Sequence, residues 1–193
     1  MKQFITVVLI SFLVACGGKD EKPVVEEQPL QPMVKSKNSD TFNTSFQQLL
    51  DAYFSLKNQF IAEDVTAIHQ YGNVLLQKTD SLKTNALKGD AGIIENANSF
   101  RDVISGELKA MVAEKDIMAQ KKSFGMISEA LYTLFRVVQY DRSILYQMST
   151  DKAFENNTGS ATWLSLTKNI QNPYKPKTLL TDGAIKKKKK TVQ

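Results

Sequence analysis

From Phe42 onward, large apolar residues recur along the chain at steps of three and four. The first run consists of Phe42, Phe46, Leu49, Leu50, Tyr53, Leu56 and Phe60. Residues at this spacing share one face of an α-helix, whereas in a strand successive side chains alternate between opposite faces. The pattern therefore predicts an amphipathic helix over residues 42–60.

Three further runs with the same period follow. Asp64 is a good N-cap for a second helix, whose apolar face would contain Val65, Ile68, Gly72, Leu75 and Leu82. Lys88-Gly89-Asp90 predicts a turn and a new N-cap, followed by Ile93, Ala97, Phe100, Ile104, Leu108 and Met111. A fourth run begins near Lys115 and contains Ile117, Phe124, Ile127, Leu131, Leu134, Phe135 and Val138. Four such helices joined by short turns predict an all-α, up-down four-helix bundle.

The segment after Tyr140 has a different character. Ser149–Ser160 is rich in Ser, Thr, Asn and Asp, which predicts a loop. No run shows the sustained alternation that is typical of a half-buried strand. We expect an irregular C-terminal segment that wraps the bundle and buries Trp163.

The N-terminus predicts export. Lys2 precedes an apolar run over residues 4–14, which is too short to span a bilayer but has the length of a signal-peptide core. The run ends in Leu13-Val14-Ala15-Cys16, which resembles the lipobox of bacterial lipoproteins. This resemblance implies that Cys16 is acylated and becomes the new N-terminus. The alternative is an ordinary secretory signal with an incidental cysteine.

These features divide the chain into four parts. Residues 1–15 form a lipoprotein signal peptide, and residues 16–41 form the lipidated cysteine and a disordered linker that contains Pro23, Pro29 and Pro32. Residues 42–185 form the helical-bundle domain, and residues 186–193 form a lysine-rich tail. We expect a lipid-anchored protein of the cell envelope, in the outer membrane rather than the inner one. The tract Gly17-Gly18-Lys19-Asp20-Glu21 resembles the signal of surface-exported lipoproteins in some Bacteroidota.

Charge and cysteine content exclude several classes of function. Lys and Arg number 25 against 20 Asp and Glu, but five lysines are consecutive (Lys186–Lys190), and without them the counts are equal. The domain therefore lacks the basic stripe of a nucleic-acid-binding protein. The tail either contacts anionic lipid or is a solvated end. Cys16 is the single cysteine, so an acylated chain has no thiol for a disulfide or a thiolate metal site.

Two stretches of the second half resemble a known family. The first is Asp116-Ile117-Met118-Ala119-Gln120-Lys121 with Phe124 and Ser128. The second runs from Leu145-Tyr146 through Ala153-Phe154, Trp163-Leu164-Ser165, Ile170, Asn172-Pro173-Tyr174, Leu180-Thr181 and Gly183. Together they resemble an uncharacterised envelope domain of Bacteroidota lipoproteins, which also occurs fused to the adaptor subunits of heavy-metal efflux pumps. The resemblance covers residues 42–185 and is most specific over the last forty.

The family's cysteine, methionine and histidine residues suit copper and similar ions, so the resemblance implies heavy-metal handling. This chain differs at those positions. Thr150-Asp151-Lys152 replaces the family's Cys-Pro-Met, residues 179–183 (Leu-Leu-Thr-Asp-Gly) replace its Met-Leu-x-Cys-Gly, and Ser123 replaces its histidine. A lysine at a ligand position repels a cation. We therefore expect a retained scaffold with a degenerate metal site and no cofactor.

Four residues remain as candidate copper ligands: His69, Met118, Met126 and Met148. His69 lies beside the apolar face of the second helix, where a hydrogen-bonded boundary residue is the ordinary interpretation. Met111 fits the core of the third helix, and methionine is in general a common core residue. The three other methionines would form a thioether cluster only if the fold brought them together.

The sequence favours binding over catalysis. A serine or cysteine triad would depend on His69, and no nucleophile motif accompanies it. Asn172-Pro173-Tyr174 predicts a rigid turn in which Tyr174 packs its ring and uses its hydroxyl. With Trp163 and Gly183, this motif is expected to be structural. We therefore expect a non-catalytic binding or accessory module that acts with an envelope protein partner. The alternatives are a copper-binding lipoprotein and a purely structural one.

Overall fold

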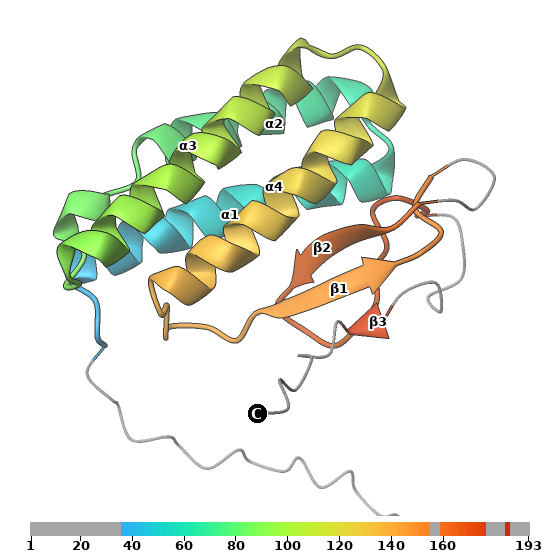
Figure 1. Cartoon of the computed structure of the whole chain (residues 1–193). Coiled ribbons are helices and arrows are strands. Elements are labelled where there is room, and N and C mark those ends of the chain that lie inside the picture. Colours follow the sequence, from blue (N-terminus) through green and yellow to red (C-terminus); the bar gives the residue numbers. More distant parts are fainter. Residues whose placement is uncertain (1–35, 155–158, 177–183, 186–193) are drawn as a thin grey trace, which may run out of the picture. The chain divides into compact units, whose positions relative to one another are not determined.

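The computed structural model describes residues 36–154, 159–176 and 184–185. It contains the helices α1 (Asp40–Ala62), α2 (Val65–Asp80), α3 (Ala91–Ala113) and α4 (Ile117–Val137), with a short 3-10 helix, η1 (Thr84–Ala86), after α2. Consecutive long helices run in opposite directions and pack side by side (Figure 1). The predicted up-down four-helix bundle is thus confirmed. The predictions for Cys16, for most of the linker, for Gly183 and for Lys186–Lys190 lie outside the described residues.

Each long helix begins at a side-chain cap. Ser39, Asp64, Asp90 and Asp116 accept hydrogen bonds from backbone N–H groups in the first turns of α1, α2, α3 and α4. Such caps satisfy N–H groups that have no partner within the helix, and each contributes about 1 kcal/mol. The predicted caps at Asp64 and Asp90 are confirmed.

The predicted apolar face of α1 forms the centre of the core, and all seven of its residues are fully buried. Large rings fill the space between α1 and α4: Tyr53 stacks on Phe124 with centroids 5.3 Å apart, and Phe60 lies 4.7 Å from the same ring. The prediction for Val65 is wrong, because its side chain is 43% exposed. Val65 is the first residue of α2, at the end of the bundle, and the buried face of that helix begins at Ile68.

The C-terminal segment contains a small antiparallel sheet that the sequence did not predict. Its strands are β1 (Tyr146–Thr150), β2 (Ala161–Ser165) and β3 (Ala184–Ile185), in the order β2-β1-β3. All five residues of β2 are buried, so the strand lacks an exposed polar face and shows no alternation. The predicted loop Ser149–Ser160 is corrected at its start, since Ser149 and Thr150 belong to β1.

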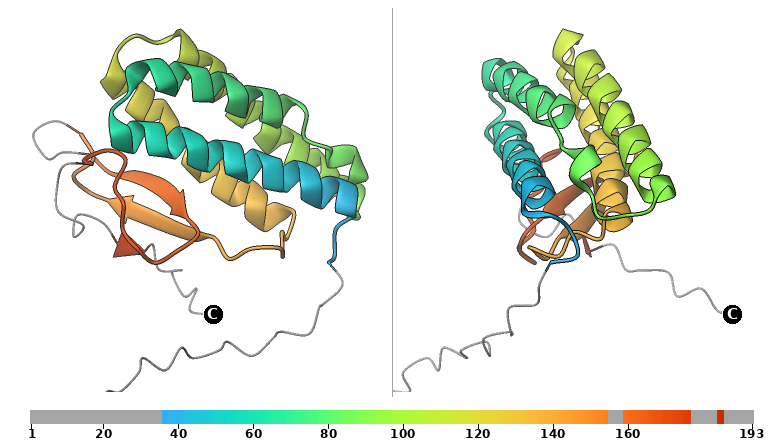
Figure 2. Two further views of the ribbon diagram at one scale, coloured as in Figure 1. Left: turned by 180° about the vertical axis from the view of Figure 1, so that it is seen from behind. Right: turned by 90° about the vertical axis from the view of Figure 1, so that its left-hand side faces the viewer.

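The sheet packs against the side of the bundle that α1 and α4 form (Figure 2). Side chains also bond the outer edge of β2: Leu164 N–H donates to the Tyr53 hydroxyl over 2.9 Å, and the Tyr174 hydroxyl donates to Thr162 C=O over 2.6 Å. Lys57 approaches Leu164 C=O at 3.4 Å. Trp163 is fully buried, as predicted. The C-terminal segment is therefore part of the core, and its edge strand is protected from pairing with another chain.

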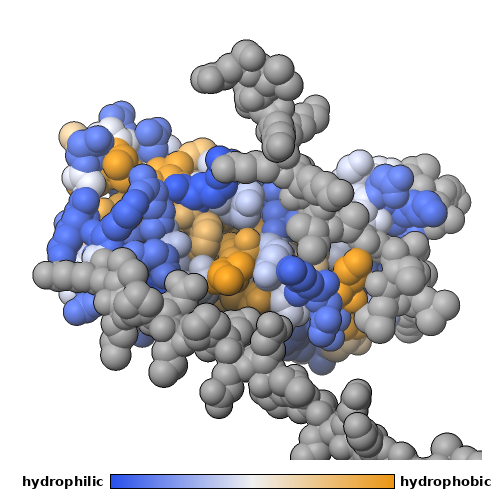
Figure 3. All heavy atoms as spheres, turned by 90° about the horizontal axis from the view of Figure 1, so that it is seen from below, coloured by the Kyte–Doolittle hydropathy of each residue, from blue (hydrophilic) through white to orange (hydrophobic). Residues whose placement is uncertain are grey.

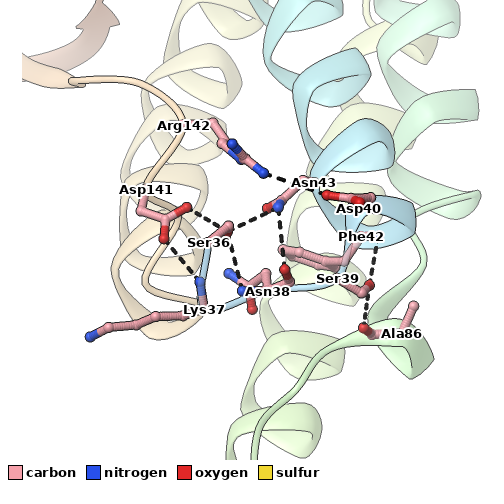
Figure 4. Close-up of polar contacts among 10 residues, drawn as sticks. All are labelled: Ser36, Lys37, Asn38, Ser39, Asp40, Phe42, Asn43, Ala86, Asp141 and Arg142. Atoms are coloured by element: carbon pink, nitrogen blue, oxygen red, sulfur yellow. Dashed lines mark hydrogen bonds and ion pairs between the residues drawn. The ribbon is translucent and has the colours of Figure 1, made fainter. Parts of the chain in front are cut away.

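The two ends of the bundle differ in their connections. At the end where α1 begins and α4 ends, here the proximal end, Ser36 Oγ donates to Asp141 Oδ1 over 2.6 Å and Lys37 N–H donates to Asp141 Oδ2 over 3.1 Å (Figure 4). These contacts fix the chain six residues before the predicted domain boundary at Phe42. The opposite, distal end carries the α1–α2 and α3–α4 connections. Among the described residues, none of the helices combines the length and the apolar character that a membrane-spanning helix needs.

Candidate functional site

A pocket of about 600 Å³ lies between α4 and the distal ends of β1 and β2. Its lining consists of Lys122, Gly125, Met126, Glu129, Ser149, Thr150, Asp151, Phe154, Ser160, Ala161 and Thr162. The volume falls within the range of small-molecule sites, roughly 300–1,000 Å³. Its lining combines apolar side chains with charges of both signs, which suits an amphipathic group.

Glu129 is the most firmly positioned charged residue of the pocket. One carboxylate oxygen accepts a 2.8 Å hydrogen bond from Gln147 Nε2, and the other accepts a 3.0 Å bond from Thr162 Oγ1. The two donors come from β1 and β2, so the carboxylate joins α4 to both strands. A carboxylate held in this way offers a fixed negative charge to a ligand.

A cation and an aromatic ring form another part of the pocket wall. Lys122 Nζ lies 5.9 Å from the centroid of the Phe154 ring, within cation–π distance. Gly159 has a φ of +74°, and a Cβ there would meet the Phe154 ring at 2.5 Å. Glycine is therefore required at this position both for its backbone conformation and for the space that the ring occupies.

Tyr174 packs behind the residues that line the pocket. Its ring packs against Phe124, Phe154 and Trp163, with centroids 6.1 Å away in each case. Asn172 Oδ1 accepts a bond from Tyr174 N–H, which closes the turn predicted for Asn172-Pro173-Tyr174. Burial raises the pKa of Tyr174 well above its ordinary value. The hydroxyl is therefore a neutral donor to Thr162 C=O, and the motif is structural in the described fold.

The four candidate copper ligands lie in different surroundings. Met126 is 49% exposed and lines the pocket, whereas Met148 is fully buried opposite Trp163 in the sheet. Met118 lies in the first turn of α4, eight residues and roughly 12 Å of helix before Met126. His69 lies on α2. The fold therefore does not gather the three methionines into one thioether cluster.

Both ring nitrogens of His69 are engaged. Nδ1 lies 3.0 Å from Val112 C=O, which can only accept, so Nδ1 carries the proton. Nε2 lies 2.9 Å from Gln120 Nε2, whose amide also donates to Glu114 C=O over 2.9 Å. This arrangement uses the neutral ring to join α2 to the α3–α4 connection. It is the boundary role that the sequence favours for this histidine.

Two of the positions at which the resemblance implies substituted ligands lie at the pocket. Thr150 and Asp151 line it, and Lys152 follows them as an exposed residue. Ser123, where the resemblance implies a histidine, does not line the pocket and is the neighbour of Lys122 on α4. Among the described residues, no group of three or more His, Cys, Asp or Glu is arranged to hold a metal ion.

A second polar site lies under the sheet. Burial lowers the pKa of Lys57 to about 8, and its ammonium also lies 5.2 Å from the Phe54 ring centroid. Burial likewise raises the pKa of Tyr53, which bonds to Leu164 and Ser128. These groups hold β2 against α1, so their role is structural.

Sequence reasoning did not single out Lys122, Glu129 or Thr162. Glu129 and Thr162 lie 33 residues apart, and only the packing of β2 on α4 brings them together. The spacing of Lys122, Met126 and Glu129 on one helix, at steps of four and three, was an available signal. It has the same form as any solvated helix face and therefore did not stand out.

Comparison with known proteins finds one family. Residues 49–143 match the family described as "Protein of unknown function (DUF3347)". The match extends from within α1 to the residues after α4 and ends before β1, so the C-terminal motifs lie outside it. No curated protein and no solved structure matches the chain. The four-helix part of this chain is thus similar, over residues 49–143, to the DUF3347 family, whose function is unknown.

Proposed function

We propose that this protein is a non-catalytic, lipid-anchored envelope lipoprotein whose ligand site is the pocket between α4 and the sheet. The observation that carries the proposal is the convergence of an exposed thioether, an aromatic ring and a fixed carboxylate on one pocket of about 600 Å³. Apolar contact with Met126 and Phe154, together with polar contact at Glu129, suits an amphipathic group of an envelope partner. The engagement of both His69 nitrogens supports a role without acid–base catalysis.

The pocket itself can be tested by photo-crosslinking in intact cells. A photoreactive amino acid replaces Met126, which is 49% exposed in the pocket, or Val103, which is 51% exposed on α3 outside it. We expect a discrete crosslinked product from position 126 that position 103 does not give. Equal products from both positions, or none from position 126, would reject the pocket as the site and favour a purely structural lipoprotein.

Lipid anchoring rests on the lipobox-like sequence before Cys16 and can be tested separately. Mass spectrometry of the mature N-terminal peptide is expected to show an acylated Cys16. An unmodified N-terminus at this or another residue would refute the anchor without affecting the test of the pocket. Fractionation of the acylated protein between inner and outer membranes then tests the expected outer-membrane location.

Copper binding is the second candidate function, and one observation favours it: Met126 exposes its thioether beside the Glu129 and Asp151 carboxylates. Lys122 in the same pocket opposes it, because an ammonium repels a metal cation. Anaerobic titration of the mature chain with Cu(I) separates the two functions. The proposed degenerate site predicts no saturable binding. Stoichiometric binding that Met126→Leu abolishes and Met148→Leu preserves would establish the copper-binding alternative instead.

A further inference from the structure

Hydrogen-bond acceptors gather around Glu129 in the pocket between α4 and the sheet. Thr162 Oγ1 donates its only proton to Glu129 Oε1 over 3.0 Å, so toward a ligand this hydroxyl can only accept. The Glu129 carboxylate accepts from Thr162 and from Gln147 Nε2, and an ionised carboxylate has no proton to donate. A ligand group that contacts this part of the pocket must therefore supply the donors.

The sheet adds a further acceptor. Ser149 lies directly opposite Thr162 in the register of β1 and β2, and both residues line the pocket. Side chains of directly opposite residues share one face of a sheet, with Cβ atoms about 5 Å apart. Gln147, two residues before Ser149 in β1, points to the same face, as its bond to Glu129 shows. The carboxylate thus lies over a sheet face that presents two hydroxyl groups to the pocket.

Apolar surface lies beside these acceptors. Met126 precedes Glu129 by three residues, on the same face of α4, and its side chain is 49% exposed. The Phe154 ring, which packs edge-on against Tyr174, also lines the pocket. On the side of the molecule where the sheet lies, hydrophobic side chains are exposed among hydrophilic ones (Figure 3). A ligand that fits the pocket therefore combines hydrogen-bond donors with an apolar stem.

The charges of the pocket favour a cation at Glu129. Glu129 and Asp151 are acidic, against one basic residue of the lining, Lys122. Lys122 precedes Glu129 by seven residues, or roughly 10 Å of helix, which exceeds the Debye length of about 8 Å at physiological ionic strength. Repulsion between Lys122 and a cation at Glu129 is therefore largely screened. A metal ion held by Met126 would lie within about one helical turn of Lys122, so the same screening does not apply to it.

From these observations, and resting on the pocket proposed above as the ligand site, we infer that the pocket binds a primary ammonium group on an aliphatic stem. The three N–H donors of the ammonium bond to Glu129, Thr162 and Ser149, and the stem packs on Met126 and Phe154. A quaternary ammonium has no N–H donor and cannot bond to these acceptors. A lysine side chain of an envelope partner has the required form, and so does a small aliphatic amine.

Four probes with the same six-carbon stem separate the classes of ligand: n-hexylammonium, n-hexyltrimethylammonium, hexanoate and 1-hexanol. Each is titrated into the Cys16→Ser chain that begins at residue 16 and contains every residue that the structure describes. The NMR signal of the isotope-labelled Met126 methyl group reports binding in the pocket. Met118, which lies eight residues earlier on α4 and does not line the pocket, is the internal control.

We expect n-hexylammonium to shift the Met126 signal saturably and to leave the Met118 signal in place. The other three probes lack either the positive charge or the N–H donors, so their dissociation constants should be at least about tenfold higher. If one of them binds as tightly, the ammonium inference is overturned and the pocket remains a ligand site. If no probe shifts Met126, the inference is overturned as well, and photo-crosslinking at position 126 decides separately whether the pocket is the ligand site.

Variants test the roles of the acceptors. Glu129→Gln should raise the dissociation constant of n-hexylammonium at least about tenfold, because it removes the charge from the acceptor. The matched control Glu95→Gln, at an exposed glutamate on α3, should leave it unchanged. Ser149→Ala keeps the bonds of Glu129 and should raise it about threefold or more, so the test holds even if Glu129→Gln loosens the sheet. If n-hexylammonium binds both pocket variants as tightly as the parent, the inference is overturned.

The crosslinked product from position 126 in intact cells distinguishes the two sources of the ammonium. A protein partner should be crosslinked at a peptide that contains a lysine, whereas a free amine should give an adduct of small mass. Digestion and mass spectrometry identify the product. A crosslinked peptide without a lysine would overturn the inference and would leave the pocket as the ligand site.

Discussion

The hydroxyl groups of Tyr53 and Ser128 lie 2.7 Å apart at the centre of an ordered chain of hydrogen bonds. Ser128 Oγ donates to Phe124 C=O over 2.7 Å, so the Tyr53 hydroxyl must donate to Ser128. The Tyr53 hydroxyl oxygen also accepts a hydrogen bond from Leu164 N–H over 2.9 Å. This chain of hydrogen bonds joins β2, α1 and α4 through buried groups, and the donor and the acceptor of each bond are determined.

Tyr53→Phe is expected to lower the free energy of unfolding by about 1–3 kcal/mol, because it leaves the buried Leu164 N–H without its acceptor. Urea denaturation measures the change. The control is Tyr132→Phe, at a half-buried tyrosine for which the described part of the chain shows no hydrogen bond, and little change is expected there. Equal stability of Tyr53→Phe and the parent would mean that the chain of bonds contributes nothing to the attachment of β2.

The buried ammonium of Lys57 should make the free energy of unfolding depend on pH. Its pKa in the folded protein is about 8, below the ordinary value of 10.5, because burial penalises the ammonium. Between these values the unfolded chain binds more protons, so the free energy of unfolding rises with pH above about 8. Lys57→Met removes the penalty and should increase stability at pH 7 by roughly 1–2 kcal/mol, after the loss of the weak bond to Leu164 C=O.

The measurement for Lys57→Met is a series of urea denaturations from pH 7 to roughly pH 9, about one unit below the ordinary pKa of tyrosine. The parent protein should gain stability over this range, and the variant should show a smaller gain. A variant whose curve runs parallel to that of the parent would show that Lys57 is solvated in the folded state.

Gly125 and Gly106 form a matched pair of helical glycines. A Cβ at Gly125 would lie 3.2 Å from the Tyr174 hydroxyl, which is fixed by its 2.6 Å bond to Thr162 C=O, whereas a Cβ at Gly106 meets nothing within 4 Å. Gly106→Ala should therefore stabilise the protein by about 0.5–1 kcal/mol through helix propensity alone. Gly125→Ala should destabilise it, because the hydroxyl cannot move without losing its bond.

Thermal denaturation of these two variants, alone and with Tyr174→Phe, tests the explanation. Removal of the Tyr174 hydroxyl should reduce the destabilisation caused by Gly125→Ala and leave the effect of Gly106→Ala unchanged. A double-mutant cycle resolves the two cases. Independent effects of Gly125→Ala and Tyr174→Phe would place the cause of any destabilisation elsewhere.

The helices could be predicted from the sequence because their signals are local. The apolar face from Phe42 to Phe60 and the caps at Asp64 and Asp90 depend on residues a few positions apart, and the structure has all of them. Val65 was wrongly assigned to the core because periodicity does not show where the bundle ends. In β2, the burial of all five residues removes the alternation by which a strand is recognised.

The pocket could not be predicted in the same way. Its fixed carboxylate, Glu129, takes its geometry from Gln147 and Thr162, which lie 18 and 33 residues further along the chain. No local pattern encodes these contacts. Met126 was identified as a candidate ligand, but sequence alone did not separate it from Met148, which the fold buries against Trp163.

The hydrogen bonds of Asp141 should make the attachment of the segment that precedes α1 depend on pH. The Ser36 hydroxyl, with smaller help from Lys37 N–H, lowers the pKa of this exposed carboxyl below its ordinary value. The ionised form therefore holds Ser36 and Lys37 at pH values above the ordinary carboxyl range, and the hold is lost as the pH falls through the lowered pKa.

Asp141→Ala should release the segment at neutral pH, with faster hydrogen exchange at Lys37 N–H. Asp102→Ala is the control, because Asp102 is an exposed carboxylate paired with Arg101 on α3. Exchange at Lys37 that is equally fast in the parent and in Asp141→Ala would show that Asp141 does not hold the segment against the bundle, so that α1 rather than Ser36 would be the first fixed point of the domain.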